Sequence, residues 1–485
     1  MNDRWEAVIG LEIHVQLSTR TKMFCGCEVT FGEPPNTRVC PVCLGHPGVL
    51  PAVNEKAVEY ATRIALALDC HIAERTIFHR KNYFYPDLPK AYQISQYDLP
   101  LGVGGHLDVE LDDGSTFRVG INRVHMEEDA GKLVHAGGAS GRIDGADYSL
   151  VDFNRGGTPL VEIVSEPDLR TPEEARAFLT QLRGLVQQLG VSDVNMEEGS
   201  LRCDANLSLR RRGEPLGTKT ELKNMNSFRF LQRGLEAEIE RQEGALEAGE
   251  KIVQQTVHFD PATGTVSALR SKEEAHDYRY FPEPDLTPIE LDRAYVDRLQ
   301  AGLPELPAAR KERLARDYAL SPKDAALLAA NKPLGDYFEA LAGETGDARL
   351  AANWVLGEVS AHINAAGLEA EQFPVSVGAL AEMLGLVRTG TLSGKMAKEV
   401  FEAMTATGKS ATAIVAEKGL GQISDAGQLE AIVARILAEN PGPAEDFRQG
   451  KEKALGFFVG QVMKETRGQA NPQLVNELLR KHLAG

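Results

Sequence analysis

The sequence lacks the features that would place the protein in a membrane or outside the cell. No run of residues approaches the roughly eighteen uncharged apolar positions that a membrane-spanning helix needs. The N-terminal segment contains Asp3 and Glu6, whereas a secretory signal begins with basic residues and continues as an unbroken apolar core. We therefore expect a cytoplasmic protein without membrane contacts.

Positive charge is scarce, because 53 Lys and Arg stand against 70 Asp and Glu in the 485 residues, for a formal net charge of -17. Such a balance argues against nonspecific coating of nucleic acid but does not exclude a local basic surface. Residues 448–485 hold seven Lys and Arg against three Asp and Glu. We expect any polyanion to bind near this end, although charge alone is equally compatible with an incidental basic helix surface.

Two common catalytic signatures are absent. The segment from Gly408 to Ser410 would complete a P-loop only if position 403 were glycine, and that position is Ala403. The sequence contains no GxSxG elbow, and no cysteine stands out as a nucleophile. We therefore reject a Walker nucleotide fold, and ammonia from glutamine would have to be made by another polypeptide.

Changes in composition along the chain indicate several domains, as expected at this length. Roughly the first 290 residues alternate between polar and apolar positions and are rich in Gly, Pro and aromatics, which is typical of strands joined by shaped loops. From residue 296 the apolar spacing becomes helical, and a Gly- and Thr-rich stretch near residue 408 indicates a second joint. We predict domains at 1–295, 296–408 and 409–485, without internal repeats.

The most specific motif consists of two cysteine pairs, Cys25 with Cys27 and Cys40 with Cys43, separated by twelve residues. Four thiolates at this spacing can surround one zinc ion and stabilise a segment too small to build its own core. Because all four ligands come from the protein, such a site is structural. Two disulfides are the alternative, which a cytoplasmic chain disfavours. We predict a zinc-binding insertion at 25–43.

Acidic and histidine side chains suggest a second metal site. In residues 9–17, apolar positions alternate with Glu12 and His14, whose side chains therefore share one face and start roughly 7 Å apart. The run HMEEDAGK at 125–132 adds further carboxylates, and Glu162 has apolar neighbours that would make an unpaired charge costly. Oxygen ligands with one imidazole favour Mg²⁺ or Mn²⁺. A solvent-facing strand surface is the alternative for Glu12 and His14.

Two later segments are expected to pair as a hairpin with a charged surface. Residues 201–210 alternate between an apolar face and a face that carries Arg202 and Asp204, and residues 219–223 place Glu221 on one face with two lysines.

Residues 80–100, RKNYFYPDLPKAYQISQYDLP, are dense in Tyr, Pro and Lys. One interpretation is a packed aromatic loop. The other is a platform on which Lys81 and Lys90 meet phosphates while the rings stack on bases or on a terminal adenosine. The sequence leaves both open.

Taken together, these segments resemble one family closely, the B subunit of the three-subunit aminoacyl-tRNA amidotransferase, or GatB. The matching segments are GLEIHVQL, RKNYFYPDLPKAYQISQYD, HMEEDAGK, NRGGTPLVEIVSEPDLR, MEEGSLRCDANLSLR, TELKNMNSF, YRYFPEPDL and GQANPQLVN. They span essentially the whole chain. The resemblance implies an α+β protein with a glutamine-synthetase-like antiparallel-sheet cradle domain, an all-helical domain and a small helical tail that docks on the tRNA body.

The resemblance also implies roles for individual residues. Mg²⁺ is expected at Glu12, His14, Glu127, Glu128 and Glu162, and zinc at Cys25, Cys27, Cys40 and Cys43. Catalytic roles are expected for Lys81, Asp204 and Glu221, and ATP contacts for Lys81, Lys90, Lys132 and Arg202. Because some family members lack the four cysteines, zinc is not expected to take part in the chemistry.

The activity implied by the resemblance is that of an ATP-dependent carbon–nitrogen ligase. It phosphorylates the side-chain carboxylate of Asp-tRNA(Asn) or Glu-tRNA(Gln), and ammonia from an amidase-type A subunit then forms the amide, while a small C subunit completes the heterotrimer. Two other classes compete with it, a noncatalytic tRNA-binding scaffold and a metal-dependent hydrolase that works without ATP. A scaffold would need neither a buried Glu162 nor a metal at Glu12 and His14.

Overall fold

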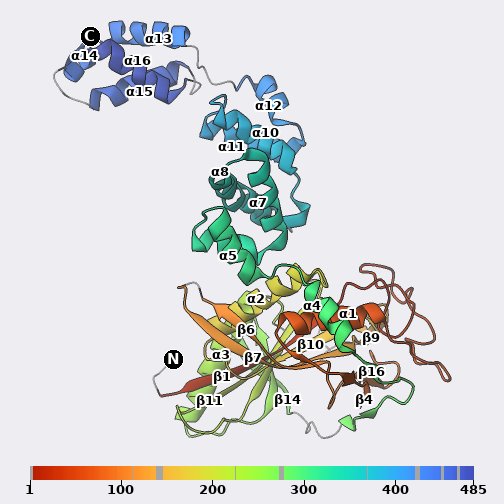
Figure 1. The fold of residues 1–485 in the computed structure, drawn as a ribbon. Coiled ribbons are helices and arrows are strands. Elements are labelled where there is room, and N and C mark those ends of the chain that lie inside the picture. Colours follow the sequence, from red (N-terminus) through yellow and green to blue (C-terminus); the bar gives the residue numbers. More distant parts are fainter. Residues whose placement is uncertain are drawn as a thin grey trace. The chain divides into compact units, whose positions relative to one another are not determined.

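The computed structural model of the chain describes residues 4–111, 113–137, 146–223, 225–271, 278–368, 370–420, 426–448, 453–466 and 470–484. The chain divides into two compact units, residues 1–309 and 310–485 (Figure 1). Within the described residues, none of the helices combines the length and the apolar character that crossing a bilayer requires.

In the described part of the first unit, the strands are accompanied by helices α1 to α4. The strands are β1 (Glu6–Gln16), β2 (His71–Ile72), β3 (Arg75–Thr76), β4 (His79–Asn82), β5 (Tyr92–Ser95), β6 (Gly102–Glu110), β7 (Thr116–Glu128), β8 (Lys132–Ala136), β9 (Tyr148–Asp152), β10 (Pro159–Ser165), β11 (Leu201–Arg210), β12 (Thr220–Lys223), β13 (Gln255–Asp260), β14 (Thr265–Ser271), β15 (Phe281–Pro282) and β16 (Ile289–Glu290). The helices are α1 (Glu55–Ala67), α2 (Pro172–Leu189), α3 (Phe228–Glu247) and α4 (Arg293–Ala301).

One large sheet of twelve strands organises this unit. Its strands follow the order β14-β13-β12-β11-β1-β10-β7-β5-β4-β15, with β6 paired to β7 and β2 paired to β6. The central pairs are antiparallel, and β12 pairs with β13 in parallel. Two-stranded sheets are formed by β16 with β3 and by β8 with β9. A sheet-rich front portion followed by helices confirms the predicted α+β class.

The alternation of β1 decides which face of the sheet becomes the core. Ile9, Leu11, Ile13 and Val15 are almost completely buried and form one hydrophobic cluster with residues of α1, α2 and α3. The polar side chains between them lie on the other face and keep partial exposure. The one-sided pattern predicted for this strand is confirmed, and the polar face is the place where its charged side chains can meet.

The ends of the helices follow local sequence signals. Helix α2 begins after Thr171, whose side chain accepts a hydrogen bond from the backbone N–H of Glu174, and Pro172 occupies its first turn. It ends at Gly190, which has a φ of 66° and adopts the left-handed conformation that glycine tolerates best. These signals fix the segment whose apolar face covers the sheet.

The rest of the chain is helical. Its elements are α5 (Pro307–Asp317), α6 (Pro322–Ala330), α7 (Lys332–Thr345), α8 (Ala348–Trp354), the π-helical turn η2 (Val355–Val359), α9 (Ser360–Ala366), the 3₁₀ turn η3 (Ala370–Gln372), α10 (Val377–Arg388), α11 (Gly394–Thr407), α12 (Ala411–Lys418), α13 (Ala426–Glu439), α14 (Pro441–Arg448), α15 (Lys453–Glu465) and α16 (Pro472–Ala484). One hydrophobic cluster runs from Leu314 to Ile414 and another from Leu429 to Leu483.

Helix α12 follows directly after the domain boundary predicted at residue 408. Its side chains Ala411 and Ile414 are buried in the same cluster as residues of α10 and α11. The break between the two hydrophobic clusters therefore lies after Leu420. At the other predicted joint, Val296 of α4 is buried in the cluster of the first unit, so the segment that follows residue 295 still packs on the sheet domain.

Candidate active site and cysteine centre

A row of ionisable side chains crosses the centre of the large sheet. In the strand register, His14 of β1 lies opposite Glu162 of β10 on one side and opposite Arg202 of β11 on the other. Glu162 in turn lies opposite His125 of β7. Because paired strands lie about 4.8 Å apart, this register brings side chains from four strands into contact distance on the polar face.

Three of the predicted metal ligands converge within this row. The Nε2 atom of His14 lies 3.6 Å from a carboxylate oxygen of Glu127 and 3.6 Å from one of Glu162. One ligand atom from each of the three residues lies within 4.8 Å of the others. Ligands at neighbouring corners of a Mg²⁺ octahedron are separated by about 3 Å and opposite ones by about 4.2 Å. The observed spacing therefore suits a single hydrated divalent cation.

His125 belongs to the same cluster, although it was not among the predicted ligands. Its Nε2 atom lies 3.1 Å from Glu162 and 4.0 Å from Glu127. His125 and Glu127 are two residues apart on β7, so their side chains point to the same face. The alternation of this strand is the signal by which the sequence could have identified it.

The protonation equilibria reflect this close packing of charge. Burial alone would disfavour the charged form of His14, but the hydrogen bond and charge of Glu162, together with the charge of Glu127, raise the pKa of His14 to about 9. Burial likewise favours neutral Glu162, yet His125 and His14 hold its pKa well below the usual value. Since a metal ligand must be a neutral imidazole, a cation bound here would displace the His14 proton.

Glu12 and Glu128 lie outside the group of converging ligand atoms. Glu12 accepts a hydrogen bond of 2.9 Å from the side-chain amide of Asn206. Glu128 follows Glu127 directly and therefore points to the opposite face of β7. There it forms an ion pair with Lys90 and accepts a 3.0 Å hydrogen bond from the backbone N–H of Ile94.

A second charged group occupies the polar face near β12. Asp204 of β11 lies opposite Glu12 of β1. The Nζ atom of Lys223 lies 2.9 Å from Asp204 and 3.3 Å from Glu221, and Glu221 accepts a 3.0 Å hydrogen bond from Thr256. The predicted pairing of β11 with β12 is confirmed by the register, which places Asn206 opposite Glu221. Asp204 and Glu221 thus lie close together, because both carboxylates contact Lys223.

Lys81 of β4 lies beneath aromatic rings. Its Nζ atom is 5.1 Å from the ring centre of Tyr278 and 5.8 Å from that of Tyr83. Burial alone would lower the pKa of Lys81, but the negative charge of Glu127 acts against this, and the net effect raises the pKa. Nearby, the rings of Tyr97 and Tyr280 are stacked with centres 4.4 Å apart. Lys81 is therefore a half-buried cation that interacts electrostatically with the carboxylate cluster.

The other predicted ATP contacts lie in different places. Arg202, on the polar face, has its guanidinium 3.0 Å from Asp129, a carboxylate that also accepts a 2.6 Å hydrogen bond from Gln16. Lys90 is engaged by Glu128 on the opposite face. Lys132 is exposed at the start of β8, in a separate two-stranded sheet.

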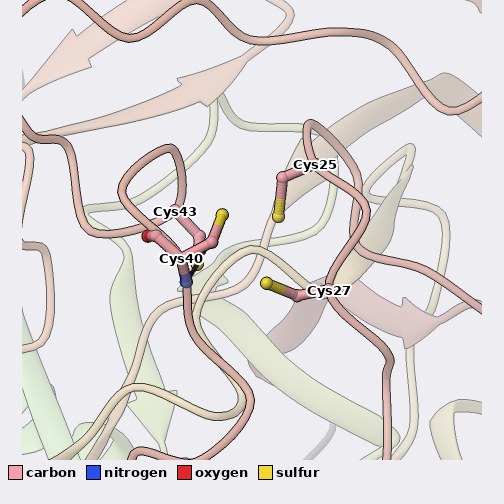
Figure 2. Close-up of side chains that lie close together, drawn as sticks. All are labelled: Cys25, Cys27, Cys40 and Cys43. Atoms are coloured by element: carbon pink, nitrogen blue, oxygen red, sulfur yellow. Dashed lines mark hydrogen bonds between the residues drawn. The ribbon is translucent and has the colours of Figure 1, made fainter.

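The four predicted zinc ligands form a compact group. Figure 2 shows Cys25 and Cys27 on one loop and Cys40 and Cys43 on another, with their sulfur atoms gathered around a common centre. All four are free cysteines, and the sulfur atoms of Cys40 and Cys43 are 3.9 Å apart. A disulfide requires about 2.05 Å, whereas two thiolates on one tetrahedral zinc are separated by about 3.8 Å. The spacing fits a metal centre.

The electrostatics of the group agree with metal binding. A hydrogen bond from Cys25, with further help from the backbone N–H of Cys40 and the charge of Lys22, lowers the pKa of Cys43 to about 4. The hydrogen bond to Cys43 is the largest factor that raises the pKa of Cys25. The surroundings therefore already favour a thiolate at Cys43, which is the form that binds a metal. A cavity of about 210 Å³ lies beside the centre, and Lys22, Cys43, Lys90 and Glu128 help to line it.

Comparison with known proteins gives one consistent result. The family model described as the GatB/GatE catalytic domain matches residues 7–297, and the GatB domain model matches residues 336–483. The chain is 56% identical over 481 residues to the B subunit of the aspartyl/glutamyl-tRNA(Asn/Gln) amidotransferase of Carboxydothermus hydrogenoformans, covering 99% of both chains. The corresponding proteins of Moorella thermoacetica (56% identity over 480 residues) and Geobacter sulfurreducens (54% over 485 residues) match over their whole length. Each match covers 99% of this chain.

Proposed function

Because the chain belongs to the GatB family of amidotransferase B subunits, we propose that it uses ATP to phosphorylate the side-chain carboxylate of Asp-tRNA(Asn), Glu-tRNA(Gln) or both. The activated group is then converted to an amide, which makes the chain the ligase component of a cytoplasmic tRNA-dependent amidotransferase. A carboxylate is a poor acyl donor because its leaving group would be oxide. Transfer of the γ-phosphoryl group supplies a better leaving group and makes attack by ammonia feasible.

The observation that carries this proposal is the convergence of His14, Glu127 and Glu162, from three strands, at one buried spot on the polar face. Two carboxylates and an imidazole form an oxygen-rich ligand set that Mg²⁺ accepts. Held by His14, Glu127 and Glu162, Mg²⁺ would offset the negative charge of the ATP phosphates. A purely structural scaffold gains no stability from burying two carboxylates in this way, because their desolvation costs free energy.

The lysines of the polar face have complementary roles in this proposal. Lys81 is held under the rings of Tyr83 and Tyr278, so its ammonium group is already positioned to offset the charge that develops on the transferred phosphoryl group. Lys223, between Asp204 and Glu221, offers a second cation on the same face. Both act by position and charge and need no change of protonation.

Some of the predicted ATP contacts have a role in this proposal, and others do not. Besides Lys81, Arg202 shares the polar face with His14, and its contact with Asp129 holds it in place for a phosphate oxygen. Lys90 and Lys132 stay predictions, since the structure places them away from this face. Glu12 and Glu128 stay predictions that have no part in this proposal, since their carboxylates lie outside the group formed by His14, Glu127 and Glu162.

Two partners and a tRNA surface complete the proposed assembly. Ammonia is supplied by an amidase-type A subunit through a shielded path, because ammonium in water is not a nucleophile, and a small C subunit joins the complex. The helical tail at the C-terminal end, whose last 38 residues are rich in Lys and Arg, binds the tRNA body. The four cysteines hold a structural zinc ion outside the reaction.

The test is a phosphoryl-transfer assay on the assembled complex. With γ-labelled ATP and mischarged tRNA, the variant Glu162→Gln should transfer label to the aminoacyl group roughly 100-fold or more slowly than the wild type, because one charged ligand of the cation is lost. The matched control is Glu166→Gln, four residues further along the chain, whose carboxylate accepts a hydrogen bond from Asn122 and which should retain the wild-type rate.

The assay is to be run with each mischarged tRNA, and with and without the A and C subunits. Phosphorylation without amide formation is expected when the A subunit is missing. A folded Glu162→Gln variant that phosphorylates either tRNA at the wild-type rate would contradict the metal assignment, and hydrolysis of glutamine or an ester without ATP would favour the hydrolase.

A further inference from the structure

Lys22 has an unusual environment for a lysine. Its side chain has no exposed surface, although lysine is almost never fully buried unless it is paired. Its Nζ atom lies 3.7 Å from the sulfur of Cys43 and donates a 3.2 Å hydrogen bond to the backbone carbonyl oxygen of Phe153. The buried ammonium group therefore faces a sulfur atom and a carbonyl oxygen rather than a carboxylate.

The charge of the cysteine centre explains why a cation is useful at this place. Four thiolates around one Zn²⁺ carry a net charge of about -2, and a buried charge is costly unless an opposite charge or a hydrogen bond compensates it. Cys43 already accepts a 3.2 Å hydrogen bond from the backbone N–H of Cys40. The ammonium group of Lys22 adds a full positive charge next to the same sulfur.

The chain around Lys22 keeps its ammonium group in place. Its backbone N–H donates a 2.9 Å hydrogen bond to the carbonyl of Cys27, and the next residue, Met23, donates one of 2.7 Å to Gly157. Gly157 has a φ of 87°, and a Cβ atom there would lie 3.3 Å from Cδ of Lys22. The lysine stem is thus enclosed between the cysteine loops and residues 153–158.

Residues 153–158 also reach the polar face of the large sheet. Gly157 donates a 2.8 Å backbone hydrogen bond to Asp129, and the backbone N–H of Asp129 donates one of 2.9 Å to Thr158. The side chain of Asp129 holds Arg202. A continuous set of contacts therefore leads from the cysteine centre through Lys22 to the charged face.

We propose that Lys22 is the counter-cation of the four-cysteine metal centre and that it ties this centre to residues 153–158, an inference that rests on zinc being the occupant of the centre. Lys22 is a positioning residue in this assignment. It holds the thiolate of Cys43 in place and makes the order of residues 153–158 depend on the bound metal.

The test measures metal retention by the full-length chain rather than its activity. The variant Lys22→Met keeps the length and bulk of the side chain but removes its charge. It should lose zinc to an excess of chelator roughly 10- to 100-fold faster than the wild type, as is typical when a partner of a metal ligand is removed. Backbone amides of residues 153–158 should also exchange hydrogen faster. The control Lys56→Met removes an exposed lysine that pairs with Glu59 and should leave both rates unchanged.

A second variant and a measurement on the wild type cover the case in which Lys22→Met does not fold. Lys22→Gln retains a donor for the Phe153 carbonyl and should still release zinc faster. In the wild type, acetylation followed by mass spectrometry should find Lys22 protected while zinc is bound and modified after chelation, with Lys56 modified in both states. Zinc release from a folded Lys22 variant at the wild-type rate, equal protection of Lys22 with and without chelator, or a purified wild-type chain without zinc would each overturn the proposal.

Discussion

At the scale of single residues, two neighbouring glutamates have different surroundings. Glu127 faces His14 on the polar side of the sheet, and Glu128 faces Lys90 on the other side. Both are buried, so each needs a compensating charge. The difference follows from the pleat of β7, which turns successive side chains to opposite faces.

This separation leads to a prediction for two substitutions. Glu127→Gln should slow phosphorylation of mischarged tRNA roughly 100-fold or more and raise the Mg²⁺ concentration needed for half-maximal rate, because a charged ligand is lost. Glu128→Gln should leave the Mg²⁺ requirement unchanged and reduce stability by about 3 kcal/mol, because the largely buried Lys90 loses its partner. Mg²⁺ titration of the labelled-ATP assay and urea unfolding measure the two effects.

Circular dichroism of both variants is the control for folding. An increased Mg²⁺ requirement for Glu128→Gln, together with an unchanged one for Glu127→Gln, would reverse the assignment of the two side chains.

The sequence identified most of the ionisable residues of this face but not all of their neighbours. The run HMEEDAGK places Glu127, Glu128 and Asp129 next to one another, so carboxylates lie on both faces of the strand and the run does not reveal which face meets His14. The metal set predicted from the resemblance therefore included Glu128 and omitted His125. The register of β10 against β7, which sets His125 opposite Glu162, is a long-range pairing that the local sequence does not encode.

At the level of secondary-structure elements, the packing of α1 against β6 requires a glycine at position 105. A Cβ atom at Gly105 would collide with the carbonyl oxygen of Leu68, the residue that ends α1, and with the sulfur of Cys70. Gly244 in α3 is the opposite case, since a Cβ atom there has open space around it. The same substitution should therefore have opposite effects at these two positions.

Gly105→Ala should reduce stability by about 1–3 kcal/mol, because backbone atoms would have to move to admit the methyl group. Gly244→Ala should increase it by up to about 1 kcal/mol through the higher helix propensity of alanine. Thermal unfolding of the full chain gives the sign, and hydrogen exchange of peptides from residues 55–110 and 228–250 shows where the change arises. A stable Gly105→Ala variant with unchanged exchange would contradict the close approach of α1 and β6.

At the scale of the whole molecule, charge is unevenly distributed along the chain. Residues 421–485 contain eight Lys and Arg against eight Asp and Glu, so residues 1–420 carry the full net charge of -17. The last hydrophobic cluster begins at Leu429, whereas α12 packs on the preceding cluster. A truncation after residue 420 thus removes one cluster without opening the other.

Deletion of 421–485 should weaken tRNA binding by at least about tenfold at moderate salt and flatten the dependence of log Kd on log salt, because phosphate contacts are lost. Hydrolysis of ATP in the absence of tRNA should continue at the wild-type rate. Filter binding over a range of salt concentrations measures the first effect and phosphate release the second. The tail assignment fails if the truncated chain binds tRNA with unchanged affinity and salt dependence.

The sequence by itself determined the features that depend on neighbouring residues. These are the one-sided β1, the pairing of β11 with β12, the spacing of the four cysteines and the change from strands to helices, all of which follow from short-range periodicity and turn chemistry. The resemblance supplied the family. Only the tertiary structure decided which carboxylates converge with His14, that Glu128 faces Lys90, and that Lys22 lies buried against Cys43. Those outcomes depend on strand register and on contacts between residues more than twenty positions apart, which no local pattern specifies.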